Sequence, residues 1–165
     1  MTTNGSKYVV AIFAILAAYL VYQWWFNENR IIKRRLGEVA STLSAPESET
    51  PVERLARLAR LRRFVDENGR VSLGRTQYSR DEAIGAAAAW QLPPGGWNVD
   101  FADVDVRVSS DDSARAFATA EMTTRDTQTS QPQSLGSVEV TFTLAKKSGE
   151  WLITEAGVKR PATTP

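Results

Sequence analysis

The sequence predicts an α+β domain, with helices packed on a curved antiparallel sheet, behind one N-terminal transmembrane helix. Three observations predict this class. The first is a run without charges from Tyr8 to Phe26, and the second is a pair of helix-start signals in the first half of the chain. The third is a change from a helical period to strict alternation after Trp97. Helices followed by a run of strands are typical of an α+β layer arrangement.

The uncharged run is long enough to cross a bilayer. About 19 residues at roughly 1.5 Å each approach the ~30 Å of a hydrocarbon core. A soluble core helix would show a polar stripe, and a cleaved signal peptide would have small residues after the run, which instead ends in Gln-Trp-Trp-Phe. We therefore predict an N-terminal tail (1–7), a membrane anchor (8–26), one soluble domain (28–160) and a disordered tail (161–165).

Residues suited to a membrane–water boundary gather at the two ends of this run, aromatic ones within it and basic ones after it. The candidates for the membrane interface are Tyr8, Tyr22, Trp24, Trp25, Arg30, Lys33, Arg34 and Arg35. The positive-inside rule, counted literally, puts the following domain in the cytoplasm. Long domains can cross the membrane despite flanking charge, so the sequence leaves both compartments open.

The first half of the domain carries helical patterns. Apolar residues recur at helical spacing over 29–43, and Pro46 and the polar residues around it end that helix. Thr50 with Glu53 forms a capping box for a second helix, whose basic run over 54–63 is expected to be a solvated face.

The sequence "DENG" should break the second helix, and "RVSL" should form a short strand. Ser79 with Glu82 forms the next capping box, and the small residues of "AIGAAAAW" should let the third helix pack closely against a neighbour.

Beyond Trp97 the chain alternates between apolar and polar residues, which is typical of strands. The alternation covers "VDVRV", the alanines after "SSDDS", "VEVTFTL" and finally "EWLITEAGVKR". Short turns between these segments predict an antiparallel meander. The polar stretch "TTRDTQTSQPQS" between two of them is expected to be a long loop.

The order of these elements resembles the nuclear transport factor 2-like superfamily, also called cystatin-like or SnoaL-like. The resemblance depends on "SRDEAIGAAAAW" after a short strand and on the hairpin "VTFTLAKKSGEWLITEAGV", and it covers residues 28–160. It implies a cone in which helices cover the concave face of a curved sheet. It also implies sheet-to-sheet dimerisation, for which Glu139, Thr141 and Thr143 are candidate interface residues.

Some proteins of this superfamily are isomerases, dehydratases or cyclases that use an acid/base pair inside the cone. The chain has no histidine, so a carboxylate would have to be the base. The weak catalytic candidates are Asp103, Asp105, Glu121, Glu139 and Glu155, although each alternates as an outward-facing strand residue would. Candidates for lining a cavity are Tyr78, Trp90, Trp97, Phe117 and Trp151, although aromatic residues at such positions are more often part of core packing.

Other chemistries find no support in the sequence. There is no cysteine or histidine, no glycine-rich phosphate loop, no nucleophile elbow and no acidic loop with calcium spacing, so we predict no metal and no cofactor. Nucleic acid binding is not expected either, because the leucines within the basic "RLARLARLRR" belong to a packed helix and no aromatic platform accompanies them.

The sequence therefore favours a single-pass, non-catalytic module that presents its domain to protein partners at a bacterial membrane, with a homodimer through the sheet as a further expectation. The alternative is a small-molecule-binding protein or carboxylate-dependent enzyme that uses the cone. Single-span proteins similar to the assembly component of type IV secretion systems place this fold in the periplasm. By that analogy we expect an extracytoplasmic domain, with the cytoplasm as the alternative.

Overall fold

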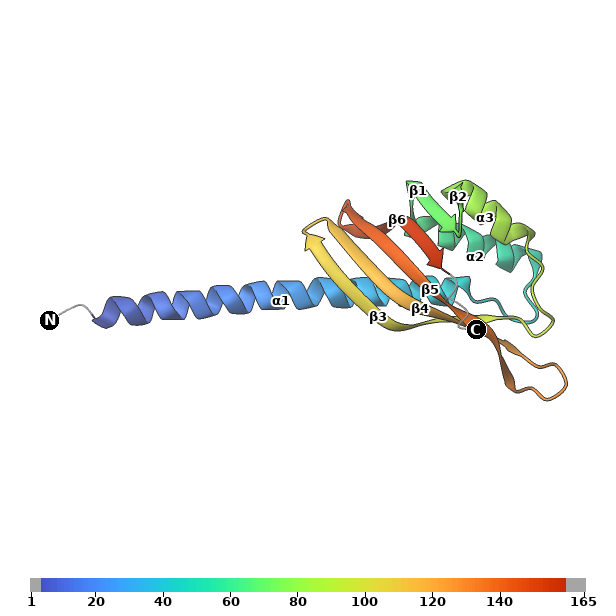
Figure 1. Ribbon diagram of the computed structural model, residues 1–165, viewed down its shortest axis with the longest axis horizontal. Coiled ribbons are helices and arrows are strands. Elements are labelled where there is room, and N and C mark those ends of the chain that lie inside the picture. Colours follow the sequence, from blue (N-terminus) through green and yellow to red (C-terminus); the bar gives the residue numbers. More distant parts are fainter. Residues whose placement is uncertain (1–3, 160–165) are drawn as a thin grey trace.

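The N-terminal helix α1 (Asn4–Leu43) runs without interruption from near the start of the chain into the domain (Figure 1). The computed structural model describes the backbone of residues 4–159, and their side chains except those of 4–9 and 24–26. The predicted anchor (8–26) and the predicted amphipathic helix (29–43) form one continuous helix in the structure. No proline lies between the two segments, so the helical hydrogen bonds continue through Asn27 and Glu28.

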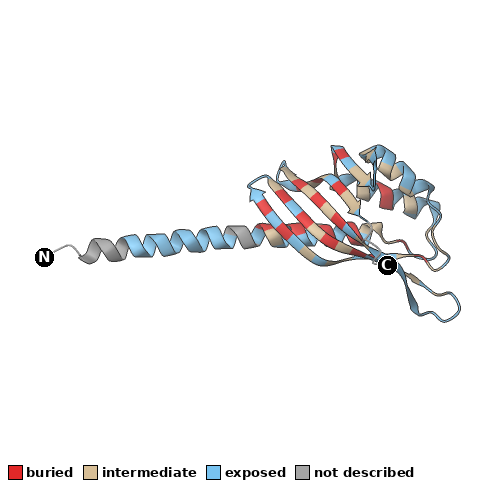
Figure 2. Cartoon of the chain, viewed as in Figure 1, coloured by how far each residue is buried: buried red, intermediate tan, exposed pale blue. Residues whose placement is uncertain are grey.

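The two halves of α1 have opposite environments. The described side chains from Val10 to Gln23 are all exposed, whereas several residues after Asn27 are buried against the sheet (Figure 2). In the part of the chain that the structure describes, α1 is the one helix long and apolar enough to cross a membrane, and none of its apolar window is buried. These properties are those of an apolar helix outside any core, and its insertion into a membrane stays a prediction.

Both predicted capping boxes are confirmed. Helix α2 (Pro51–Phe64) begins after Thr50, whose hydroxyl accepts from the backbone N–H of Glu53 while the Glu53 carboxylate accepts from the N–H of Thr50. Helix α3 (Arg80–Ala89) begins in the same way after Ser79. Helix α3 packs beside α2 and β1 at the edge of the domain, and none of its residues is fully buried (Figure 1).

The strands form one six-stranded sheet in the order β2-β1-β6-β5-β4-β3. All neighbours are antiparallel except β1 and β6, which are parallel. The strands are β1 (Val65–Leu73), β2 (Thr76–Ser79), β3 (Asn98–Ser110), β4 (Ser113–Arg125), β5 (Pro132–Lys147) and β6 (Glu150–Lys159). The predicted antiparallel meander is therefore β3 to β6, and the α+β class is confirmed.

Helix α2 ends at Phe64, beside the predicted break at "DENG", and the predicted strand "RVSL" is the last part of β1. "DENG" itself belongs to β1 as a bulge of four residues opposite the single residue Thr154. The prediction of a long loop later in the chain is wrong. The polar stretch 123–134 is mostly a two-stranded ribbon, in which β4 reaches Arg125 and β5 starts at Pro132. The ribbon projects beyond the sheet (Figure 1), and only 126–131 connects its strands.

The core lies between the domain half of α1 and the concave face of the sheet. Alternation along β4 turns four alanines toward the helix (Ala114, Ala116, Ala118 and Ala120). Because alanine is small, the helix can approach closely, and Ile32 and Leu36 fill the space above the sheet with exposed fractions of 0%. Phe142, Leu144, Trp151 and Ile153 complete this layer from β5 and β6.

Candidate functional site

The concave face of the sheet, where the resemblance implies a ligand cavity, is occupied by apolar side chains of α1 and the strands. Among the described residues, the buried charged ones are Glu28, Arg57 and Asp66, and each lies at the rim of this layer in an ion pair. Glu28 meets the β5–β6 turn, Arg57 meets the end of α1, and Asp66 belongs to the β1 bulge. The middle of the layer is apolar.

The weak catalytic candidates are all exposed and lie on different strands: Asp103 and Asp105 on β3, Glu121 on β4, Glu139 on β5 and Glu155 on β6. Asp105 pairs with Arg107 on its own strand, at 3.0 Å between Oδ2 and Nε. Asp103 lies in a β3 irregularity with φ +51°. The structure does not bring these carboxylates together. In the described residues, no group of three or more His, Cys, Asp or Glu could hold a metal ion.

The five aromatic cavity candidates separate into three places. Trp151 is buried in the core, whereas Phe117 lies on the outer face of the sheet with the Arg107 guanidinium 5.2 Å from its ring centre. Trp90 and Trp97 meet edge to face at 4.6 Å, near the end of α1. Tyr78 lines a cleft of about 400 Å³ beside β2. Trp151 alone of the five belongs to the core between α1 and the sheet.

The junction between α1 and the β5–β6 turn contains a buried acid, Glu28, that was not among the predicted site residues. Glu28 is 6% exposed, and its two oxygens accept from Lys146 Nζ and Trp151 Nε1, each at 2.7 Å. Burial raises the pKa of Glu28, but these two hydrogen bonds and the Lys146 charge outweigh it, so that the pKa lies below its ordinary value. The carboxylate therefore stays ionised and joins the helix to the turn. In the sequence, the only indication of this contact is that its two partners, Lys146 and Trp151, lie close together on either side of the turn in "KKSGEW".

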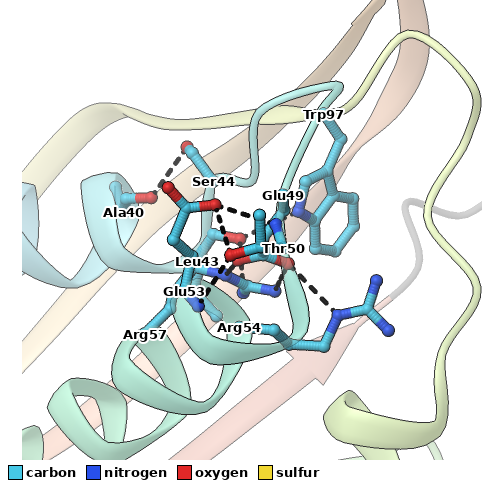
Figure 3. Close-up of polar contacts among 9 residues, drawn as sticks. All are labelled: Ala40, Leu43, Ser44, Glu49, Thr50, Glu53, Arg54, Arg57 and Trp97. Carbon is cyan, nitrogen blue, oxygen red and sulfur yellow. Dashed lines mark hydrogen bonds and ion pairs between the residues drawn. The ribbon is translucent and has the colours of Figure 1, made fainter.

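The other end of α1 is held by a second ionic cluster (Figure 3). Arg57 donates to both carboxylate oxygens of Glu49, at 2.6 and 3.1 Å, and to the carbonyl of Leu43 at 3.4 Å. The indole of Trp97 donates to the same carbonyl at 2.8 Å. The Arg57 hydrogen bond keeps the pKa of Glu49 low despite burial. The expectation that the basic run of α2 is solvated is wrong at Arg57, which is 7% exposed because it caps α1.

The predicted membrane-interface residues fall into three groups. The side chains of Tyr8, Trp24 and Trp25 lie outside the described residues. Tyr22, Arg30, Lys33 and Arg34 are exposed. Arg35 instead faces the domain, where its guanidinium lies 4.6 Å from the Phe64 ring centre and its Nη2 lies 3.2 Å from a carboxylate oxygen of Glu150.

The surface offers several open clefts. One of about 670 Å³ lies at the α1–α2 connection, beside Trp97 and Arg125. Another, of about 560 Å³, lies where α2 meets the bulge of β1. A third, of about 210 Å³, lies between α1 and the β5–β6 turn. The candidate interface residues Thr141 and Thr143 are half-buried on the outer face of the sheet, and Glu139 is exposed there.

No protein-family model and no curated protein matches the sequence. Solved structures match its fold. A nuclear transport factor 2-like protein with a cystatin-like fold from Novosphingobium aromaticivorans has 16% identity and a TM-score of 0.63, over 88% of this chain and 90% of its own. The chain has the nuclear transport factor 2-like fold.

Two further structures with this similarity differ widely in what their names say. A protein from the same bacterium, named provisionally as a scytalone dehydratase, has 14% identity and a TM-score of 0.65, over 85% of this chain and 96% of its own. The association domain of C. elegans CaMKII has 9% identity and a TM-score of 0.57, over 84% and 96%. The nuclear transport factor 2-like fold thus accompanies both an enzyme name and an association domain, and it does not decide between them.

Proposed function

We propose that this protein is a non-catalytic binding or assembly module, anchored by a single membrane span, that presents its nuclear transport factor 2-like domain to protein partners. One observation carries the proposal: the helix with the exposed apolar half is the same helix whose other half fills the concave face of the sheet. A ligand in the cone would have to displace Ile32 and Leu36, the most deeply buried residues of α1. Binding is therefore assigned to the outer surfaces.

The exposure pattern of α1 supports the span. Its apolar side chains from Val10 to Val21 lie all around the helix and are largely exposed, so water would be a costly environment for them. Cleavage after the apolar run would fall close to Glu28, whose carboxylate holds the helix to the β5–β6 turn. An uncleaved anchor fits this arrangement better than a signal peptide.

The outer face of the sheet is the surface proposed for partners. Five exposed carboxylates and half-buried threonines give it a mixed polar character, whereas the buried carboxylates Glu28 and Asp66 are held in ion pairs with Lys146 and Lys147. Pairing of two copies through Glu139, Thr141 and Thr143 is the proposed mode of dimerisation. Tethering to a membrane raises the effective concentration toward partners in that membrane, which benefits a binding module more than a metabolic enzyme.

The first test asks whether the chain is an integral membrane protein. Membranes that contain the full-length protein are washed with alkaline carbonate, and we expect the protein to stay in the pellet. Release into the supernatant would contradict the anchor. Alkaline phosphatase fused after Pro165 then reports the compartment, because that enzyme is active only outside the cytoplasm. An active fusion supports the extracytoplasmic orientation and an inactive one the cytoplasmic alternative.

The second test identifies the partners. Full-length protein is extracted from its native membrane in mild detergent, its mass is measured, and co-purifying proteins are identified by mass spectrometry. Stoichiometric protein partners, retained by the wild type and lost when Thr141 and Thr143 are replaced by lysine, would support the module. A lone monomer or dimer that carries a small apolar molecule would favour the cone-binding alternative.

A further inference from the structure

Helix α2 carries apolar residues on two opposite sides, and the domain covers only one of them. On the covered side Leu58 is buried, and Leu61 and Phe64 pack against the core. A second row has the spacing i, i+3, i+4, i+7 and therefore lies along one face of the helix: Val52, Leu55, Ala56 and Ala59. All four residues are exposed, Val52 by 76% and Leu55 by 68%. Apolar residues on two sides are typical of a helix that is covered on both.

The same face of α2 ends in two arginines. Arg60 and Arg63 continue the row, at i+8 and i+11 from Val52. Both are exposed, and neither has a hydrogen bond or ion pair in the part of the chain that the structure describes. The one acidic residue of α2, Glu53, keeps its carboxylate in the N-terminal capping box. The exposed face of α2 is thus apolar over its first two turns and cationic over its last.

The arginine end of this face borders the cleft of about 560 Å³ where α2 meets the bulge of β1. Ala59 and Arg63 belong to the exposed face and also line the cleft. The charged residues that line it are four cations and two carboxylates: Arg62, Arg63, Arg80, Lys147, Asp66 and Glu67. The other three cations each have a carboxylate within 3.2 Å, whereas Arg63 has none among the described residues. A negatively charged group is therefore the partner that Arg63 can still accept.

The exposed face of α2 lies beyond the reach of lipid headgroups if α1 spans the membrane as proposed. The C-terminal end of α2 is level with Arg35, whose guanidinium lies 4.6 Å from the Phe64 ring centre. Arg35 follows Phe26 by a helix rise of about 13 Å, whereas the headgroup layer is roughly 5–8 Å deep. The middle of α2 is level with Leu43, about 25 Å beyond Phe26, because Arg57 donates to the Leu43 carbonyl. Figure 1 shows α2 at the end of the domain away from the apolar half of α1.

We propose that the exposed face of α2 binds an amphipathic helix of a protein partner, in which an apolar stripe is followed by aspartate or glutamate residues. The stripe packs on Val52, Leu55 and Ala59, with the i, i+3, i+4, i+7 spacing by which helices are recognised. The carboxylates pair with Arg60 and Arg63. A second copy of this face is a poorer occupant, because it offers the arginines no free carboxylate. The inference rests on the proposed function, since it names a kind of partner for the module and adds a second surface to the outer face of the sheet.

The test places the photoreactive amino acid p-benzoylphenylalanine at position 56 of full-length protein in its native membrane. After illumination, the cross-linked segment is sequenced by mass spectrometry. We expect an adduct with one segment of another protein, whose sequence has apolar residues at helical spacing followed by carboxylates. The same amino acid at exposed position 75, in the β1–β2 turn, is the control and should not capture this segment.

Two sets of variants separate the apolar and charged contributions to the adduct at position 56. Leu55→Gln should lower its yield about tenfold and change Tm by less than about 2 °C, because this exposed leucine contributes little to the stability of the domain. Replacing both Arg60 and Arg63 by glutamine should also lower the yield about tenfold. Arg75→Gln is the matched control, since it removes the same charge from an exposed residue outside the face.

Several outcomes would overturn the proposal. These are an adduct with lipid, with a second copy of this chain or with a segment that lacks carboxylates, and a yield unchanged by Leu55→Gln. The photoreactive residue at position 139 on the outer face of the sheet distinguishes this failure from that of the proposed function. Capture of a protein partner from position 139 and not from 56 would overturn this inference and leave the module intact. Capture of no protein from either position would contradict both.

Discussion

Replacement of Glu28 tests whether the buried carboxylate joins α1 to the sheet. In Glu28→Ala the indole N–H of Trp151, a residue only 2% exposed, loses its acceptor. An unsatisfied buried donor costs about 1–3 kcal/mol. The ammonium of Lys146 is partly exposed, so its lost ion pair costs about 0.5–1 kcal/mol. The expected loss of unfolding free energy is therefore about 3 kcal/mol.

Glu28→Gln separates the two contributions. The glutamine carbonyl can still accept from the Trp151 indole, so only the charge interaction with Lys146 is lost, at about 1 kcal/mol. For a domain of this size 1 kcal/mol corresponds to a Tm change of about 4 °C, so we expect Tm to fall about 12 °C in the alanine variant and about 4 °C in the glutamine variant. Thermal unfolding of full-length protein in detergent, followed by near-UV circular dichroism, measures both.

A double-mutant cycle provides the control. Lys146→Met should lower Tm in the wild-type background and leave it nearly unchanged in Glu28→Gln, because the ion pair is already absent there. The reasoning is refuted if alanine and glutamine at position 28 have equal effects, since the hydrogen bond to Trp151 would then contribute nothing.

Protonation of Glu28 at low pH should lower the stability of the protein. The pKa of Glu28 is lower in the folded protein than its ordinary value of 4.5, so unfolding takes up a proton in the interval between the two values. The stabilisation is complete above pH 4.5 and is lost as the pH falls through the folded value. When Tm is measured at descending pH, it should fall less steeply in Glu28→Gln than in wild type. Equal slopes of Tm against pH would contradict the lowered pKa of Glu28.

Three further predictions concern packing and glycine conformation. Ala116→Leu should lower the free energy of unfolding by about 1–3 kcal/mol, because the concave face of the sheet is filled. The control, Ala86→Leu on the exposed side of α3, should change it by less than about 0.5 kcal/mol. If Ala116→Leu has no effect, the cone contains open space. Gly96→Ala should cost more than about 2 kcal/mol, since φ is +68° and a Cβ atom would lie 2.7 Å from the Ala45 carbonyl oxygen. Gly37→Ala, at an open helical position, should stabilise by about 0.5–1 kcal/mol. Denaturant unfolding of the four variants measures these differences.

Local patterns accounted for most of the secondary structure. Thr50 and Ser79 predicted two helix starts correctly, because a capping box uses residues only three apart. Alternation predicted β3 to β6, since side chains on successive strand residues point to opposite faces. In these segments the residues that decide the structure are close together in the sequence.

Pairing between distant segments explains what the sequence did not predict. Strand β2 is four residues long, and "DENG" resembles a turn although the residues on both sides of it pair with β6, far along the chain. The 123–134 ribbon has a loop composition, yet its two strands satisfy each other's backbone groups. A pattern read along one segment carries no information about a partner strand elsewhere.

The buried charges were missed for a related reason. Glu28 lies 118 and 123 residues from its two partners, and Arg57 resembles the solvated arginines around it. Sequence spacing cannot distinguish the arginine that caps a neighbouring helix from those that face water. The prediction of five strand carboxylates as outward-facing residues came from alternation alone, and their exposure in the structure is consistent with it.

The continuity of α1 links the proposed anchor to the interior of the domain. The two ends of its domain half are fixed by separate ionic clusters, Glu28 with Lys146 near the apolar run and Arg57 with Glu49 at the C-terminus. Opening the cone would therefore require breaking both clusters and withdrawing Ile32 and Leu36 from the sheet. Under the proposed anchoring, that movement would also tilt the span in the bilayer. The apolar half and the domain half of α1 would move together, because they belong to one continuous helix.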